Sequence, residues 1–558
     1  MKTTFKRLCT LAVPFLLASC TNPGSSSSAE VKESSNEPAS SVAASLSSSA
    51  AANNSSSNAP ASSSAKTQYT PVLPELRFTS NVPEEISFAT TATKDDLDRP
   101  NVAGKLSITN VEGDLGKTDL DCTMKVRGNQ TAGWSKKAFT IKLSSKDNLL
   151  GLNKGKKFKK WVLLADAKDT TLIRSAAGLS ISKAISKHDS KVWVADFTPV
   201  SVYLNDQYWG YYYLADQKEV KSNRIDLPAP EDNYTGVDIG YCFELDYYGK
   251  DEPKKADHGD PTFNLDYGNM FTRNSYNIES SLANFGPTTT YTMLSDITDG
   301  PADAAVNATN SNQVAFMQAR LQALFTVLYQ ATQNHAKTIN ENNQVVDFNG
   351  TVEEAIRANF DLATWTDGFI INAFTCPPDV GYSSFYMSFD NSTEGAKKLR
   401  FDCPWDFDSN FGNRRDFITT ANSSSGGNQW GGSGYDPYYM DRTSNMWLQY
   451  LGKLDFFMND VKAKWNTVRQ DESFEDMFHM MRTYWNTYDG EIQHNHEKWP
   501  VNDAAENNSF DEIREPYKYV RNYKEAEAET ISWCEKRINY LENRWAPEAH
   551  RPGVNTNK

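Results

Sequence analysis

Two aspartates lie two positions apart in a short aromatic segment that runs from Pro404 to Gly412. On an extended backbone, side chains at i and i+2 point to the same side, so Asp406 and Asp408 would face one site. Hard cations such as Mg²⁺ take one or two protein carboxylates and fill their other positions with water and phosphate oxygens. The pair therefore predicts a site for Mg²⁺ or Mn²⁺, whereas a lone Asp-x-Asp would also suit a turn with solvated aspartates. The aromatic residues expected to anchor the segment in a core are Trp405, Phe407 and Phe411.

The residues before this pair favour the metal interpretation. Asp379 is followed by the apolar run Phe385 to Met387, then by a loop, and then by Phe401 and the paired aspartates. An isolated Asp, a strand, a turn and a metal-binding Asp is the order of parts in a kinase catalytic centre. We therefore prefer a metal site over a solvated turn.

The start of the chain has the layout of a bacterial lipoprotein signal. Lys2, Lys6 and Arg7 precede the apolar run Leu8 to Leu17, and Cys20 follows directly after small residues. The apolar run is too short for a spanning helix, and the alternative is a plain secretory signal. The cysteine favours lipidation, which predicts an extracytoplasmic protein tethered to a membrane by acyl groups alone.

Residues 21 to 68 are dominated by Ser, Ala and Asn. Such a segment cannot bury enough apolar surface to offset the entropy of ordering, so it predicts a flexible stalk. We expect the folded part to run from 69 to 550. The formal net charge is −14, and only Lys154 to Lys160, interpreted as a solvated turn, forms a basic cluster beyond the signal. This balance opposes a nucleic-acid surface.

Five cysteines lie beyond the signal, and none has the Cys-x-x-Cys spacing of a zinc site. An exported chain meets an oxidising compartment, so Cys376 and Cys403 could form a bridge between the two segments of the predicted site. A second pattern, His494-Asn495-His496, lacks a third ligand and is more typical of surface residues.

The elements expected to position the site change in type along the chain. Residues 69 to 219 form a sheet-rich region with one helix from about Asp169 to Lys187, and residues 220 to 550 are mainly helical with an irregular insertion at 251 to 314. The expected strands are 73–79, 103–110, 120–126, 134–143, 192–194, 198–204 and 208–214. The later helices are expected at 316–331, 352–374 with a break near Asp361, 446–468, 474–487 and 523–545.

The second hairpin of the sheet-rich region has both an ordinary and a functional interpretation. Arg127-Gly128-Asn129 is a turn signal, and the strand that returns from it carries Lys137 and Lys142. The ordinary interpretation is an antiparallel pair with exposed lysines, and the hairpin alone favours it. The functional interpretation is a loop over phosphates followed by a strand lysine that reaches the α- and β-phosphates of a nucleotide.

Several motifs in a fixed order resemble the spore-coat protein H (CotH) kinase family. They are Arg127-Gly128-Asn129 before Lys136-Lys137-x-Phe-x-Ile-Lys142-Leu143, Asp169-x-Thr171-Leu172-x-Arg174, Val202-Tyr203-Leu204-Asn205-x-x-Tyr208-x-Gly210-x-Tyr212, and Pro404-Trp405-Asp406-x-Asp408-x-x-x-Gly412. The resemblance covers about Leu73 to Trp545. It implies an α+β, atypical protein-kinase-like bilobal fold, with a sheet-rich lobe, a helical lobe, and ATP and Mg²⁺ between them.

The resemblance also implies roles for single residues in transfer of the γ-phosphoryl group of ATP to a protein side chain. Asp379 looks like the catalytic aspartate, and Asp406 and Asp408 look like the metal-binding pair. Lys142, with Lys137 as the second candidate, would contact the phosphates. The turn formed by Arg127, Gly128 and Asn129 would cover them.

Two departures from the kinase pattern leave other functions open. Ser384 stands where an Asn would hold a second metal, and the helix that follows Thr171 contains no Glu to pair with a strand lysine. The first alternative is a surface scaffold or adhesion protein on a kinase-like fold. The second is a metal-dependent glycosyltransferase that uses the Asp406-x-Asp408 spacing.

Overall fold

The computed structural model describes residues 71–93, 99–128, 130–188, 191–231, 234–246, 262–270, 288–294, 312–377, 380–381, 383–413, 445–500 and 523–557. These residues belong to one unit of the chain, Gln68–Lys558. The signal with Cys20 and the stalk predicted before residue 69 lie outside the described ranges. None of the helices that the structure describes combines the length and the apolar character needed to cross a membrane.

Seven strands close into a barrel in the order β1-β2-β3-β4-β5-β7-β6. β1 pairs with β6 in parallel, and the other neighbouring strands pair antiparallel. The sheet-rich character expected for the first part of the folded chain is therefore confirmed. The strands are β1 (Glu75–Ser80), β2 (Val102–Thr109), β3 (Lys117–Arg127), β4 (Ala138–Asp147), β5 (Phe158–Leu164), β6 (Phe197–Leu204) and β7 (Gln207–Asp216).

Alternation along the strands fills the barrel interior. In β4, Phe139, Ile141 and Leu143 are buried in the barrel core while the intervening Lys142 is exposed. This is the period of two that a strand with one apolar face requires. Between β6 and β7, Asn205 and Asp206 both have left-handed φ values, 46° and 63°, as a tight two-residue hairpin turn demands. The predicted Asn-Asp turn is therefore confirmed.

A second sheet has five strands in the order β14-β13-β8-β10-β9. Its strands are β8 (Gly240–Leu245), β9 (Thr262–Asp266), β10 (Thr288–Met293), β13 (Phe385–Asp390) and β14 (Leu399–Asp402). Most of the secondary structure described between residues 220 and 550 is helical, as expected, but the expected insertion is not irregular throughout. Two stretches of it are the strands β9 and β10, which pair with each other, and β10 also pairs with β8.

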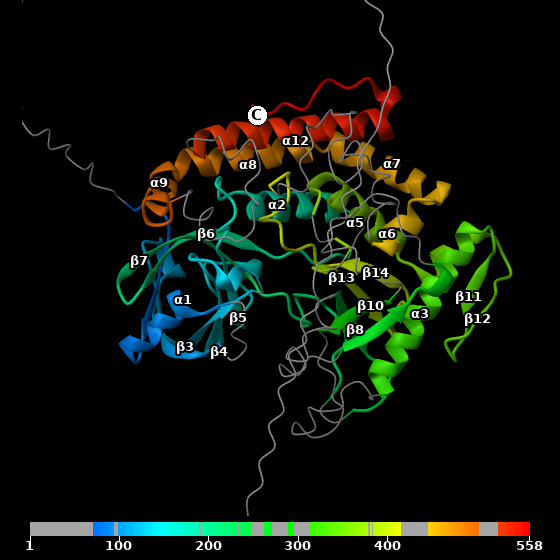
Figure 1. The fold of residues 1–558 in the computed structure, drawn as a ribbon, viewed down its shortest axis with the longest axis horizontal. Coiled ribbons are helices and arrows are strands. Elements are labelled where there is room, and N and C mark those ends of the chain that lie inside the picture. Colours follow the sequence, from blue (N-terminus) through cyan, green and yellow to red (C-terminus); the bar gives the residue numbers. More distant parts are fainter. Residues whose placement is uncertain are drawn as a thin grey trace, which may run out of the picture. The chain divides into compact units, whose positions relative to one another are not determined.

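Two helices pack against edge strands of the second sheet, α3 (Asn312–Thr332) against β9 and α5 (Leu362–Thr375) against β14 (Figure 1). The helix α5 is buried along nearly its whole length and contacts α2 and α7, and α2 also contacts α8. The helices are α1 (Phe88–Thr91), α2 (Arg174–Ser186), α3 (Asn312–Thr332), α4 (Val352–Asn359), α5 (Leu362–Thr375), α6 (Met446–Leu451), α7 (Asp455–Gln470), α8 (Ser473–Thr487), α9 (Asp489–Lys498) and α12 (Tyr523–Trp545). A short hairpin joins β11 (Lys337–Ile339) to β12 (Val345–Asp347).

Most of the predicted helices are present, and the structure shows where one ends and the next begins. The break expected near Asp361 is confirmed, since α4 ends at Asn359 and α5 begins at Leu362. The helix expected over residues 446 to 468 is two helices, because α6 ends at Leu451 with Gly452 as its C-cap and α7 begins at Asp455. Residues 192 to 194 are not a strand, and the basic cluster expected to be a turn runs into β5.

The bridge considered between Cys376 and Cys403 is not formed. Neither is part of a disulfide, and the same holds for the other three cysteines that the structure describes. Cys376 follows the last turn of α5 and its Sγ donates to the carbonyl oxygen of Ala373, whereas Cys403 is fully buried after β14. Burial raises the pKa of both thiols, which disfavours the reactive thiolate.

Candidate active site

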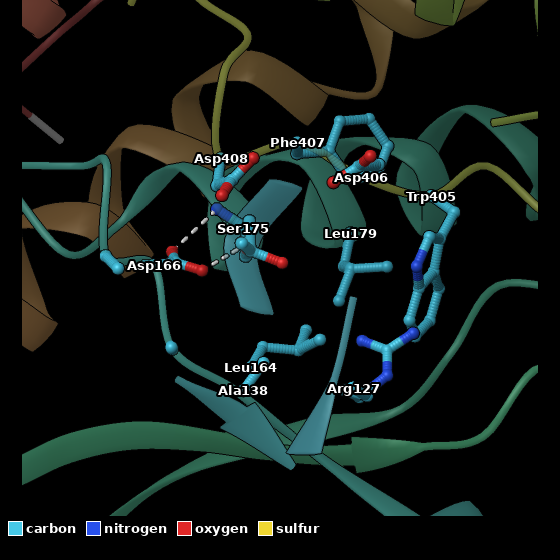
Figure 2. A pocket seen from close by; sticks show the side chains of 13 residues that line it. Arg127, Ala138, Leu164, Asp166, Ser175, Leu179, Trp405, Asp406, Phe407 and Asp408 are labelled. Atoms are coloured by element: carbon cyan, nitrogen blue, oxygen red, sulfur yellow. Dashed lines mark hydrogen bonds between the residues drawn. The ribbon is translucent and has the colours of Figure 1, made fainter. Parts of the chain in front are cut away.

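A cavity lies where the barrel meets α2 and the paired-aspartate segment. It encloses about 530 Å³ of empty space, part of it open to solvent. Figure 2 shows Arg127 beside Trp405 and Asp166 beside Ser175, with Asp408 above Ser175 and Asp406 near Phe407. The lining residues are Arg127, Thr131, Ala138, Leu164, Ala165, Asp166, Ala167, Ser175, Leu179, Trp405, Asp406, Phe407 and Asp408.

The aspartate pair reaches this cavity from an irregular backbone. Residues 403 to 408 form no strand, and Cys403 and Asp406 have left-handed φ values of 48° and 65°. The extended conformation expected for the pair is therefore wrong, although both aspartates still face one cavity. The aromatic anchors are as predicted, because Trp405, Phe407 and Phe411 are all buried in one core.

The electrostatics of the pair favour a cation. Burial and the negative charge of Asp406 together raise the pKa of Asp408 to about 6, against the opposing effect of Lys168. Two carboxylates on one cavity wall repel each other and lose hydration, so both are relieved when a cation binds between them.

A third carboxylate that lines the cavity is that of Asp166, in the loop between β5 and α2. It accepts a hydrogen bond from Ser175 Oγ at 2.5 Å and another from the Ser175 backbone N–H at 3.2 Å. Burial raises the pKa of Asp166 to about 7, helped by the charges of Asp169 and Asp408. Asp169, where the predicted helix was expected to begin, accepts the backbone N–H groups of Ile173 and Arg174 at 2.8 and 2.7 Å, and α2 itself begins at Arg174. Asp166 was not predicted, because its only signal in the sequence is its position three residues before Asp169.

Two cationic side chains lie near the aspartates. The guanidinium of Arg127, at the end of β3, is 5.6 Å from the centre of the Trp405 ring. Burial lowers the pKa of Arg127, and the negative charges of Asp406, Glu244 and Asp408 oppose that shift. The ammonium of Lys168 lies 4.8 Å from the ring centre of Trp134. Together the walls of the cavity offer carboxylates to a cation and a guanidinium to an anion.

Comparison with known proteins identifies the family of this chain. The CotH kinase protein family matches residues 124–541, which is well over half of the sequence. The chain belongs to the CotH kinase protein family. The match includes Arg127, Asp166, Asp406 and Asp408. A search of curated proteins found no match.

The structure does not bring the predicted strand lysine of this CotH kinase family member to the cavity. Lys142 is exposed on β4, because the odd-numbered residues on either side of it form the buried face of the strand. In the sheet it lies opposite Thr123 of β3 and Lys160 of β5. Lys137 is buried, and its Nζ donates to the carbonyl oxygens of Ala132 and Trp134, both at 2.8 Å. Of the residues predicted to contact phosphates, Arg127 lines the cavity.

The turn after Arg127 is described only in part. Gly128 has a φ of 98°, which favours glycine, and its carbonyl oxygen accepts a hydrogen bond from Arg99 at 2.6 Å. Asn129 lies outside the described residues. The predicted contact of this turn with phosphates therefore stays a prediction.

Ser384 is close to the pair, and the predicted catalytic aspartate is not described. Ser384 Oγ donates to Asp406 Oδ2 at 3.1 Å, and its backbone N–H donates to Glu244 Oε1 at 3.0 Å. Asp379 lies outside the described residues, so its role stays a prediction. Glu244 was missed, because its strand β8 was not recognised in the sequence.

The donor set differs from that of a protein metal cage. Within the described ranges, no group of three or more His, Cys, Asp or Glu residues could hold a metal ion. The two histidines of the His494-Asn495-His496 pattern were expected at the surface but are partly buried. His494 stacks on Tyr208, and His496 is largely enclosed near Thr170. A cation at this site would rely on the aspartate pair, water and a ligand.

Proposed function

We propose that this CotH kinase family member transfers the γ-phosphoryl group of ATP to a protein side chain, with Mg²⁺ or Mn²⁺ as its cofactor. The observation that carries the proposal is the cavity on which the Asp406 and Asp408 carboxylates face Arg127. Phosphoryl transfer needs little from a protein beyond positioning and neutralisation of charge. A pair of carboxylates for the cation and a guanidinium for the phosphates supply both.

The residues present fit a divalent cation that arrives with a nucleotide. Mg²⁺ is commonly held by one or two carboxylates and by phosphate oxygens rather than by an all-protein cage. Asp406 is exposed and Asp408 half-buried on the same cavity, so both can reach such an ion. When bound, the ion neutralises the charge that develops on the phosphates.

The remaining roles follow from charge and position. The Arg127 guanidinium, which can bind phosphate oxygens through two parallel hydrogen bonds, would orient the nucleotide, with Lys168 as a second cation. Asp379 would orient the acceptor hydroxyl. In this proposal the barrel forms one lobe and the elements after β7 form the other, and the nucleotide lies between them in a bilobal kinase-like arrangement.

The proposed place of action is outside the cytoplasm, at a membrane to which Cys20 attaches the chain through acyl groups. The layout of the first 20 residues supports this proposal. The protein substrate is not specified by the residues of the cavity, and no nucleic acid is proposed as a partner.

Nucleotide binding with and without Mg²⁺ tests the proposal. We expect Mg-ATP to raise the melting temperature of the full chain and Asp408→Asn to remove most of this effect, since one of two metal charges is lost. Asp114→Asn is the matched control, because Asp114 is exposed and does not line the cavity. Equal stabilisation of wild type and Asp408→Asn would favour the scaffold alternative. A response to nucleotide-sugars instead of ATP would favour the glycosyltransferase.

Transfer of labelled γ-phosphate to the chain itself or to a generic acceptor tests the chemistry. Asp379→Ala should abolish transfer and leave Mg-ATP affinity within a few-fold, because an acceptor-orienting group acts mainly in the transition state. Asp408→Ala should lose both transfer and affinity. Full transfer activity in Asp379→Ala would show that another residue orients the acceptor.

A further inference from the structure

A chain of contacts links strand β8 to the metal-binding pair. Glu244 on β8 accepts the backbone N–H of Ser384 through Oε1 at 3.0 Å, and Ser384 Oγ donates to Asp406 Oδ2 at 3.1 Å. Ser384 is therefore held at its backbone and delivers its hydroxyl to one oxygen of the carboxylate. A cation at the site would bind through the other oxygen of Asp406.

Glu244 is itself fixed by the sheet and by a cation. It lies opposite Tyr386 in the antiparallel pairing of β8 with β13. Its Oε2 is 3.7 Å from Nζ of Lys218, and the two side chains are only 16% and 14% exposed. The Lys218 ammonium also lies 4.0 Å from the centre of the Tyr386 ring. A carboxylate held from two sides by a sheet and an ion pair makes a rigid acceptor for the Ser384 N–H.

The backbone at both ends of this chain of contacts is in an uncommon conformation. Ser384 has a φ of 55° and Asp406 a φ of 65°, and neither is a glycine. A residue other than glycine keeps a left-handed backbone conformation only where surrounding contacts hold it there, and such residues cluster at functional sites. The Glu244 contact at Ser384 and the Ser384 contact at Asp406 are contacts of this kind.

We propose that Glu244 is a positioning residue for the cation site, which acts through Ser384 to fix the Asp406 carboxylate. The inference rests on the proposed function, because it needs a cation at the aspartate pair. It gives Ser384 the role of orienting a metal ligand, in place of the role of second metal ligand expected from its position. Groups that hydrogen-bond to ligating carboxylates orient them, and their loss typically costs about 10- to 100-fold in metal affinity.

The test is a Mn²⁺ titration of the full chain, followed by electron paramagnetic resonance, with the β,γ-imido analogue of ATP present. We expect Ser384→Ala and Glu244→Ala each to weaken Mn²⁺ affinity about tenfold without changing the number of ions bound. Glu244→Gln should recover most of the affinity, because a carboxamide oxygen can accept the same N–H. Glu244→Asp, one methylene shorter, should behave like Glu244→Ala.

A double variant shows whether Glu244 acts on Mn²⁺ binding through Ser384 or independently of it. If Glu244 acts through Ser384, Glu244→Ala with Ser384→Ala should bind Mn²⁺ no more weakly than either single variant. Ser383→Ala is the matched serine control and should bind like wild type. Thermal unfolding of every variant identifies those that fail to fold, and Glu244→Gln keeps the test open if Glu244→Ala is among them.

The outcomes distinguish this inference from the proposed function. Wild-type affinity in Ser384→Ala, additive losses in the double variant, or a fall in the number of bound ions at unchanged affinity would each overturn the positioning role alone. Failure of the wild type to bind Mn²⁺ with the nucleotide analogue would overturn the proposed function and this inference with it.

Discussion

At the scale of single residues, the cavity holds carboxylates whose ionised form is disfavoured by burial and by neighbouring negative charges. Burial and mutual repulsion raise the pKa of Asp408 to about 6 and that of Asp166 to about 7. Perturbed carboxylates of this kind gather at functional sites, because a bound cation or proton transfer makes use of them. The proton on Asp408 therefore competes with a cation.

The pH dependence of binding follows from this competition. Since a ligating carboxylate must be ionised, the affinity of the chain for Mn²⁺ with the ATP analogue should rise as the pH increases from about 5 to about 7 and then level off. Titrations at several pH values measure this, and Asp408→Asn should show a flatter profile. A wild-type affinity that stays constant over this range would contradict the placement of the cation at Asp408.

The same shift predicts how stability without ligands depends on pH. The folded protein keeps the Asp408 proton up to about pH 6, whereas the unfolded chain loses it near the usual value of 3.8. The folded state therefore binds more protons in this window, and the contribution of Asp408 to stability falls as the pH rises through it. Asp408→Asn should be more stabilising at pH 8 than at pH 4 in chemical unfolding experiments. The reverse order would contradict the raised pKa.

Which site residues could be predicted depended on how local their signal is. Asp406 and Asp408 were predicted because both lie in one short segment, and Arg127 because it opens a turn motif. Glu244 could not be predicted, since only the pairing of β8 with β13 brings it to Ser384. Asp166 resembled any other loop aspartate until its contact with Ser175 was known.

At the scale of elements, the direction of β4 decides which cation faces the cavity. A strand places alternate side chains on opposite faces, and the sequence alone does not say which face meets the ligand. In β4 the buried set includes Phe139 and Ile141, so Lys142 points outward. The chain reaches the cavity with Arg127 at the end of β3 instead.

A pair of substitutions tests this assignment. Arg127→Ala should weaken binding of the ATP analogue by about tenfold or more, since a hydrogen bond to a charged group contributes about 1.5 to 3 kcal/mol. Lys142→Ala, the matched loss of an exposed cation, should change the affinity less than about twofold. Isothermal titration calorimetry measures both. A large effect of Lys142→Ala would restore the strand lysine to the site.

The helix α2 positions the aspartate pair through its packing. Gly178 lies against Phe407, and a methyl group at Gly178 would overlap the Phe407 ring. Gly178→Ala should therefore shift the paired-aspartate segment and destabilise the fold by about 1 to 3 kcal/mol, the usual cost of overpacking. In α9, Gly490 has open space around it, so Gly490→Ala should stabilise by up to about 1 kcal/mol. Denaturant unfolding compares the two, and a neutral Gly178→Ala would contradict the close contact.

Elements with weak local patterns were the ones that the sequence did not predict. The strand β8, with the sequence Gly-Tyr-Cys-Phe-Glu-Leu, is buried on almost every position, so it lacks alternation. The strand β5 begins within a lysine-rich stretch that suggested a turn. By contrast, the long helices α3 and α12 have periodic apolar faces, and α12 was predicted with its observed bounds.

At the scale of the whole molecule, the barrel extends beyond the family match. The match begins at residue 124, within β3, whereas β1 and β2 lie before it. These two strands close the barrel, because β1 pairs with β6 on one side and with β2 on the other. The folded unit therefore needs residues from about 71 onward, while the segment before it is proposed to serve attachment.

The attachment proposal makes a prediction that is independent of catalysis. Cys20→Ala should move the protein from the membrane fraction to the soluble fraction of cells, because the acyl groups that anchor it cannot be added. The thermal transition should not change, since a Ser-, Ala- and Asn-rich stalk buries little apolar surface. Cys9→Ala is the matched control, because it removes a cysteine within the apolar run of the same signal and should leave the protein in the membrane fraction. Fractionation and immunoblotting measure the distribution, and a Cys20→Ala protein that stays in membranes would place the anchor elsewhere.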